Sequence, residues 1–246
     1  IGHQDFETVR RKNNFYIDKT EFIKEWWESD DAVTLITRPR RFGKTLNMSM
    51  LEKFFSIEYA KRDELFEGLN IWKYKEYREI QGTYPVIFLS FANVKENTYD
   101  QARESICRII QELYNKNVFL LQSNLLTDNE KEEYKQISTK MNDSMISDSV
   151  RKMSDYLSRY YGKKTIILLD EYDTPIQEAY VGGFWPDLMG VIRALLNSTF
   201  KTNPYLERAI MTGITRVSKE SIFSDLNNLE VVTTTSKKYE DKFGFT

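Results

Sequence analysis

Residues 38–45, RPRRFGKT, combine glycine, lysine and threonine in the order that phosphate-binding loops use. They match the pattern G-x-x-x-x-G-K-[ST] except at the first position, where Arg38 replaces glycine. Gly43 lets successive backbone N–H groups face an anion, and the helix that follows adds its positive end. Lys44 can reach the β- and γ-phosphates of a nucleotide, and the Thr45 hydroxyl can ligate Mg²⁺. The segment therefore predicts a phosphate site; the alternative is an arginine-rich surface turn that contains Gly-Lys-Thr by chance.

We expect the residues that contact a nucleotide in this loop to be consecutive in the sequence. They are Arg40, Arg41, Phe42, Gly43, Lys44, Thr45 and Leu46. The two arginines add positive charge beside the phosphates. Nothing else in the sequence supports DNA binding, and the phosphates would occupy this arginine cluster. We therefore expect no direct contact between this chain and nucleic acid.

A second candidate group follows the apolar run 165–169, where Asp170 and Glu171 stand in tandem. A parallel strand that ends in two carboxylates delivers them to the carboxyl edge of its sheet, where ligands of open α/β sheets bind. We expect Asp170 to hold Mg²⁺, directly or through water, and Glu171 to accept a proton from an attacking water. The alternative is a buried strand followed by an acidic turn. For the nearby Asp173 we favour a structural role over a catalytic one.

Four further residues are supporting candidates. Thr212, at the end of a later apolar run, could orient water against the γ-phosphate or be merely a strand-end hydroxyl. Arg216 could contact the γ-phosphate or act across a subunit interface, because guanidinium groups suit phosphate oxygens; a structural salt bridge is the alternative. Tyr16 and Ile17 could cover an adenine ring, although aromatic side chains in a chain with 15 Tyr and 15 Phe usually lie in the core.

The elements that position these residues alternate along the chain. Expected strands cover residues 31–37, 85–91, 165–169, 209–212 and 231–234. Helical spacing is found from Leu46 to Phe54, from Ala102 to Leu113, from Val150 to a C-capping Gly162, and over about 187–201. Strands that alternate with helices indicate an α/β fold with a mostly parallel sheet, without fixing the strand order. The polar stretch near 127–148 is expected to form exposed helices or an insertion.

Composition excludes several classes of protein. With 41% hydrophobic and 29% charged residues, the 246-residue chain can bury a substantial core and is too apolar to be disordered. Its 35 basic and 37 acidic residues argue against a globally basic nucleic-acid binder. No apolar run approaches a membrane span, and the first residues show no signal peptide. The single Cys107 and single His3 rule out an internal disulfide and the usual zinc sites, so we expect a cytoplasmic protein whose metal is held by oxygen atoms.

Several blocks of the sequence together carry a family resemblance. They are IGHQDF at 1–6, YIDKT at 16–20, RPRRFGKT at 38–45, LDEYDTP at 169–175, TGITRVSKESIF at 212–223, LNNL at 226–229 and FGFT at 243–246. With these blocks the sequence resembles the bacterial and archaeal AAA-ATPase-like family, ATPase domains often followed by a PD-(D/E)xK nuclease-like domain. The match covers nearly the whole chain, and RPRRFGKT is its most specific part.

The resemblance implies a three-layer P-loop NTPase core over residues 1–246, with a five-stranded, mostly parallel sheet in the order 5-1-4-3-2. It implies phosphate-loop roles for Lys44 and Thr45, and Mg²⁺ and water-activation roles for Asp170 and Glu171. The family shares the non-glycine opening of the loop at Arg38. A helical lid and the nuclease-like domain would be expected after residue 246.

The sequence leaves three hypotheses for function. The first is an ATPase or ATP-gated switch that uses Mg²⁺ and regulates an attached or partner domain. The second is a nucleotide-binding module that does not hydrolyse its ligand, and the third is a small-molecule kinase, which the tandem Asp170 and Glu171 disfavour. ATP is preferred over a guanine nucleotide because the Asn-Lys-x-Asp motif of guanine-binding relatives is missing from the sequence, and because the family resemblance implies an ATPase. An oligomer is possible, so Arg216 could act within its own chain or in a neighbour's site.

Overall fold

The computed structural model describes residues 3–215, 223 and 228–244. Its five strands are β1 (Val33–Thr37), β2 (Val86–Ser90), β3 (Thr165–Asp170), β4 (Leu206–Gly213) and β5 (Leu229–Val232). All pairings are parallel, and the strands lie side by side in the order β2-β3-β4-β1-β5. The expected α/β class and the strand order 5-1-4-3-2 are therefore confirmed.

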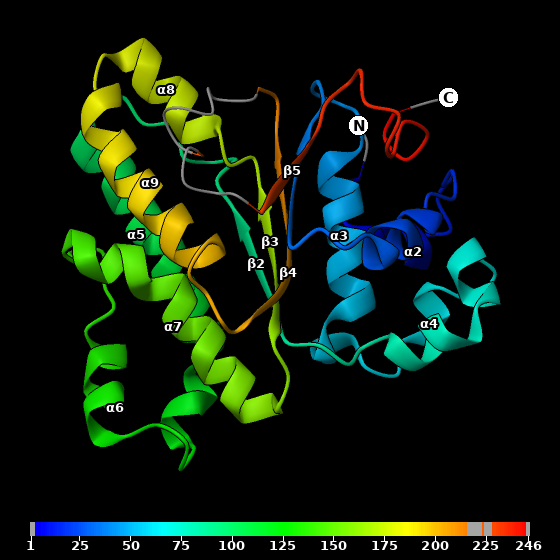
Figure 1. Ribbon diagram of the computed structural model, residues 1–246, viewed down its shortest axis with the longest axis horizontal. Coiled ribbons are helices and arrows are strands. Elements are labelled where there is room, and N and C mark those ends of the chain that lie inside the picture. Colours follow the sequence, from blue (N-terminus) through cyan, green and yellow to red (C-terminus); the bar gives the residue numbers. More distant parts are fainter. Residues whose placement is uncertain (1–2, 216–222, 224–227, 245–246) are drawn as a thin grey trace.

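Helices cover both faces of this sheet (Figure 1). The α-helices are α1 (Phe6–Arg11), α2 (Glu21–Glu28), α3 (Lys44–Phe55), α4 (Lys75–Ile80), α5 (Tyr99–Lys116), α6 (Asp128–Lys135), α7 (Asp143–Tyr161), α8 (Thr174–Gly182) and α9 (Trp185–Phe200). The 3₁₀ turns are η1 (Ile57–Tyr59), η2 (Asp63–Leu65), η3 (Asn70–Lys73) and η4 (Val118–Gln122). In Figure 1, α5, α7, α8 and α9 lie on one side of the sheet, and α2, α3 and α4 lie on the other.

The alternation of side chains along the strands explains the three layers. On β3, Ile167 and Leu169 join the core beneath α5, α7 and α9, whereas Ile166 and Leu168 join the core around α2 and α3. Every residue of β3 is buried, as its uninterrupted apolar run predicts for a central parallel strand. One apolar core therefore packs against each face of the sheet.

The strand and helix boundaries shift by a few residues from those expected. Strand β5 ends at Val232, before the expected end at residue 234, because Thr233 begins a turn in which its backbone N–H donates to the Ser236 hydroxyl at 2.9 Å. The expected C-cap at Gly162 is confirmed, since this glycine ends α7 in the left-handed region at φ 67°.

The polar stretch near 127–148 forms α6, a connecting loop and the first turns of α7. Helix α6 opens with a capping box, in which Thr127 and Glu130 satisfy each other's backbone N–H groups. The stretch is not wholly exposed, because Tyr134 and Met141 are buried in the core beneath α5 and α7. Among the described residues, none of the helices has the length and apolar character needed to cross a membrane.

Candidate functional site

The loop between β1 and α3 carries the phosphate-binding pattern, as the sequence predicts. Gly43 caps the N-terminus of α3 with φ 75° and ψ 11°, a left-handed conformation that glycine adopts without steric penalty. Arg41 also has a positive φ, 68°, so the loop curls tightly before the helix. The first backbone N–H groups of α3 consequently point out of the carboxyl edge of the sheet, where an anion is attracted.

Lys44 is folded back into this loop. Its Nζ donates hydrogen bonds to the carbonyl oxygens of Arg38 at 2.8 Å and Pro39 at 2.9 Å, and only 6% of the residue is exposed. Burial lowers the pKa of Lys44, and the carboxylates of Asp170 and Glu171 oppose that shift. An ammonium held by two neutral carbonyls is available to an anionic ligand, because a phosphate oxygen is a stronger acceptor.

Asp170 lies between two hydroxyl groups, one from the first turn of α3 and the other from the end of β4. It accepts one hydrogen bond from Thr45 Oγ1 at 2.8 Å and another from Thr212 Oγ1. Burial raises the pKa of Asp170, an effect that these two hydrogen bonds and Lys44 oppose. Thr212 and Asp170 meet because β4 lies directly between β1 and β3 in the sheet.

Thr45 and Asp170 together offer the donor set that Mg²⁺ prefers in nucleotide sites. A hydroxyl and a carboxylate are hard oxygen donors, and Mg²⁺ commonly takes one or two protein ligands and fills its octahedron with water and phosphate oxygens. Among the described residues there is no cluster of three or more His, Cys, Asp or Glu side chains that could hold a metal alone. The residues present therefore fit a Mg²⁺ ion that arrives with a phosphate ligand.

Glu171 sits in a constrained position directly after β3. Its φ of 52° is unusual for a residue other than glycine, and its backbone N–H donates to Thr212 Oγ1 at 3.3 Å. Its carboxylate accepts a hydrogen bond from Thr174 Oγ1 at 3.0 Å, at the start of α8. Thr212 thus bonds to both acidic residues, a role that the sequence alone did not indicate.

Asp173 ties the loop after β3 to the end of β4. Its Oδ2 accepts from the backbone N–H groups of Ile214 at 3.0 Å and Thr215 at 2.9 Å, and from Gln177 Nε2 at 2.7 Å. The side chain is fully buried. These contacts agree with the structural interpretation of Asp173 that the sequence favours.

Arg38, which replaces the first glycine of the motif, extends toward the segment that follows β5. Its guanidinium donates to the backbone carbonyl of Thr233 and lies 5.9 Å from the ring centroid of Phe243. Only 3% of the residue is exposed, and burial lowers its pKa. Arg38 therefore joins the loop to the segment that follows β5.

That segment, residues 233–244, packs against the phosphate loop and α3. The Gly244 N–H donates to the Phe42 carbonyl at 3.0 Å, and Asn47 Nδ2 donates to the Lys242 carbonyl at 2.9 Å. Sequence reasoning did not identify Asn47 or this packing. The glycine at 244 was the sequence signal for this packing. Gly244 has φ 84°, and a Cβ there would lie 2.9 Å from the Phe42 ring, so a larger residue would not fit against the loop.

A cavity of about 350 Å³ adjoins the loop on the side of α1. Its lining includes Tyr16, Ile17, Phe42, Gly43 and Leu46. Tyr16 is fixed there, because its hydroxyl accepts from the Lys19 N–H at 3.3 Å and lies 3.4 Å from Met50 Sδ. The two residues considered for an adenine cover are thus next to the phosphate loop.

The other sequence candidates are distributed as follows. Arg40 and Arg41 are exposed at the loop, whereas Arg216 lies outside the described residues. His3 is exposed and contributes to the lining of the cavity, and Cys107 is a buried free thiol in the core beneath α5. The described site therefore joins the loop residues with Asp170, Glu171 and Thr212.

The strand order, the loop between β1 and α3 and the acidic end of β3 define a P-loop NTPase-like core. The chain belongs to the predicted AAA-ATPase family, whose family model matches residues 1–223. It is also 28% identical over 251 residues to an uncharacterized protein in the vnfD 5′ region of Azotobacter chroococcum mcd 1. That alignment covers all of this chain and 42% of the relative. No solved structure matches the chain.

Proposed function

We propose that this chain binds Mg²⁺·ATP at the carboxyl edge of its sheet and hydrolyses it, acting as an ATPase or an ATP-gated switch. The observation that carries the proposal is the hydrogen-bonded series Thr45–Asp170–Thr212 beside the Lys44 ammonium. Membership of the predicted AAA-ATPase family supports a nucleotide as the ligand.

In this proposal the loop holds the phosphates. The backbone N–H groups of residues 42–46 and the Lys44 ammonium bind phosphate oxygens, and Arg40 and Arg41 add positive charge from the exposed side of the loop. Thr45 and Asp170 hold Mg²⁺, which when bound neutralises charge on the phosphates. The adenine enters the cavity lined by Tyr16, Ile17 and other apolar side chains, which exclude water from the base.

Glu171 is the proposed general base. Its carboxylate can accept a proton from a water that attacks the γ-phosphate once the side chain is free of Thr174. Thr212 is then a positioning residue, because its hydroxyl fixes both Asp170 and the backbone of Glu171. We keep Arg216 as a candidate for γ-phosphate contact, within the chain or across an interface.

A second candidate function is a nucleotide-binding module without turnover. The hydrogen bond from Thr174 to Glu171 favours it, since it directs the carboxylate toward α8. In such a module, nucleotide binding would regulate an attached domain, and the chain spans only 42% of the relative that it matches. A nuclease-like partner domain and a cytoplasmic location remain parts of this proposal.

Calorimetric titration of Mg²⁺·ATP, with phosphate release followed on the same samples, tests the proposal. Lys44→Ala should abolish binding, while the exposed control Lys75→Ala should bind as the unchanged chain does. Glu171→Gln should bind ATP and lose at least about 100-fold in phosphate release, the contribution expected of a general base. Binding without release in the unchanged chain would favour the second function. Equal binding by Lys44→Ala would reject the phosphate site.

A further inference from the structure

Strand β2 forms one edge of the sheet, and its unpaired backbone groups can be identified. Phe91 N–H donates to the Asp170 carbonyl at 2.9 Å, and Ile166 N–H donates to the Pro85 carbonyl at 3.0 Å. The odd-numbered residues of β2 therefore face β3. Because backbone groups alternate in direction along a strand, the N–H and C=O groups of Val86, Phe88 and Ser90 face away from the sheet.

One end of this edge already pairs with another segment. Tyr84 N–H donates to the Phe55 carbonyl and Ile57 N–H donates to the Tyr84 carbonyl, both at 2.9 Å, which makes a parallel bridge between Ser56 and Tyr84. The edge thus accepts an added strand at its first position. Its remaining length has no strand beside it among the described residues. Open edges of this kind are sites of intermolecular pairing unless something covers them.

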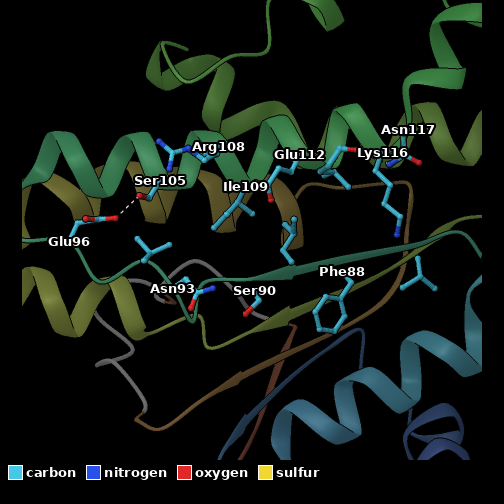
Figure 2. Close-up of a pocket in the computed structure, with 14 residues that line it drawn as sticks. Phe88, Ser90, Asn93, Glu96, Ser105, Arg108, Ile109, Glu112, Lys116 and Asn117 are labelled. Atoms are coloured by element: carbon cyan, nitrogen blue, oxygen red, sulfur yellow. Dashed lines mark hydrogen bonds between the residues drawn. The ribbon is translucent and has the colours of Figure 1, made fainter. Parts of the chain in front are cut away.

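The open part of the edge lines a groove of about 520 Å³ between β2 and α5 (Figure 2). Glu96 accepts from the Ser105 hydroxyl at 2.8 Å at one end of the groove, and Lys116 pairs with Glu58 at 3.0 Å at the other. In Figure 2, Ile109 projects from α5 toward the strand, and Leu89 and Leu113 also line this part of the groove. The Phe88 side chain lies on the opposite face of the sheet, in the core around α3. The groove therefore has polar ends and an apolar middle.

The charges of α5 along this groove are self-complementary. Glu104, Arg108, Glu112 and Lys116 alternate in sign at every fourth position. Arg108 pairs with Glu104 at 3.0 Å, and both side chains are more than half exposed. Among the described residues, Glu112 makes no ion pair. If a second α5 ran antiparallel beside the first, each of the four charges would meet one of opposite sign.

We infer that the groove is the interface of a symmetric dimer of this chain. Two β2 strands pair antiparallel about a two-fold axis near Phe88, and the backbone groups of Val86 in one copy bond those of Ser90 in the other. Arg108 of each copy then faces Glu112 of its neighbour, and Glu104 faces Lys116. A two-fold interface requires such a self-complementary patch, and its closure leaves no β2 edge open. The inference does not depend on nucleotide binding.

Sedimentation of the full chain over a range of concentrations tests this interface, with two charge reversals as variants. In a dimer of R108E, the new glutamate of each copy faces Glu112 of the other copy. In a dimer of E112R, the new arginine of each copy faces Arg108 of the other copy. Both two-fold related contacts are therefore repulsive in either variant. Each variant alone should dimerise on the order of 10-fold more weakly than the unchanged chain, since exposed ion pairs contribute modestly. An equimolar mixture of the two should recover the original affinity, because all four facing pairs are again opposite in sign. A folding defect cannot produce recovery on mixing.

A proline in the strand tests the backbone pairing separately. Ser90→Pro removes an N–H that faces the groove and makes no bond to β3, so the chain should keep its circular dichroism spectrum and lose dimerisation. Ser90→Ala keeps the N–H and should dimerise normally. The inference is overturned if the unchanged chain is monomeric at high micromolar concentration, or if R108E and Ser90→Pro dimerise as well as the unchanged chain.

Discussion

Thr45 donates a hydrogen bond of 2.8 Å to Asp170 although 125 positions separate them in the sequence. The contact depends on the strand order. Thr45 lies in the first turn of α3, directly after β1, and Asp170 ends β3. Strand β4 between β1 and β3 supplies Thr212, in register with Ile36 of β1. The order 5-1-4-3-2 thus brings the two sequence motifs to one point at the carboxyl edge of the sheet.

We predict that Asp170→Asn makes the ligand-free chain more stable. Burial raises the pKa of Asp170, so the folded state retains its proton at pH values at which the unfolded chain has lost it. Stability then falls as the pH rises from the usual carboxyl range through the raised pKa, and the ionised carboxylate lowers stability at neutral pH. The amide removes this effect, and the melting temperature at pH 7 should rise by a few degrees.

The same substitution should abolish stabilisation by Mg²⁺·ATP. At a ligand concentration 100 times its dissociation constant, the unchanged chain should gain about 2.7 kcal/mol, and Asp170→Asn should gain little. The melting difference between the two chains without ligand should also shrink as the pH is lowered toward 4. A less stable variant at neutral pH would contradict the assigned sign.

Thr212→Val should destabilise the fold, and Thr212→Ser should not do so to the same extent. Valine leaves Asp170 without one donor and the Glu171 N–H without its acceptor, which costs about 1–3 kcal/mol in a buried site. Serine keeps the hydroxyl and loses one methyl group, about 0.8 kcal/mol. Urea unfolding of both variants measures the difference. Equal midpoints would contradict the prediction, because the hydroxyl would then contribute no more to stability than the methyl group.

The sequence predicts the fold class because its signals are local and consistent. The apolar run 165–169 specifies a central strand, and Gly43 and Gly162 stand where left-handed caps are needed. The direction in which a side chain points is harder to predict from the sequence, because it depends on contacts between segments that are far apart in the chain. Arg38 occupies the first position of the phosphate-loop pattern, yet its partners are Thr233 and Phe243, about 200 positions later.

We predict that restoring the missing glycine of the motif, Arg38→Gly, destabilises the chain. The substitution removes a buried charged hydrogen bond to Thr233 and a cation–π contact with Phe243, and it adds backbone freedom. Together these effects cost about 2–4 kcal/mol. Residues 233–244 should then become more accessible to protease. The exposed Arg40→Gly is the control and should lose less than about 1 kcal/mol; similar losses in both variants would refute an anchoring role for Arg38.

Gly213→Ala and Gly190→Ala should change stability in opposite directions. Gly213 ends β4, and a Cβ there would lie 2.7 Å from Tyr172 Cε1 and 2.8 Å from Asp173 Oδ1. Both neighbours are fully buried, so neither can move freely, and overpacking of this kind costs about 1–3 kcal/mol.

Gly190 lies on the exposed side of α9, where no atom is within 4 Å of an added Cβ. Alanine there should stabilise the chain by about 0.5–1 kcal/mol, because it restricts the unfolded state and favours the helix. Denaturant midpoints with unchanged slopes measure both effects. If Gly213→Ala were as stable as the unchanged chain, the loop after β3 would have to tolerate displacement of Asp173. An unchanged midpoint for Gly213→Ala would contradict the predicted overpacking at the end of β4.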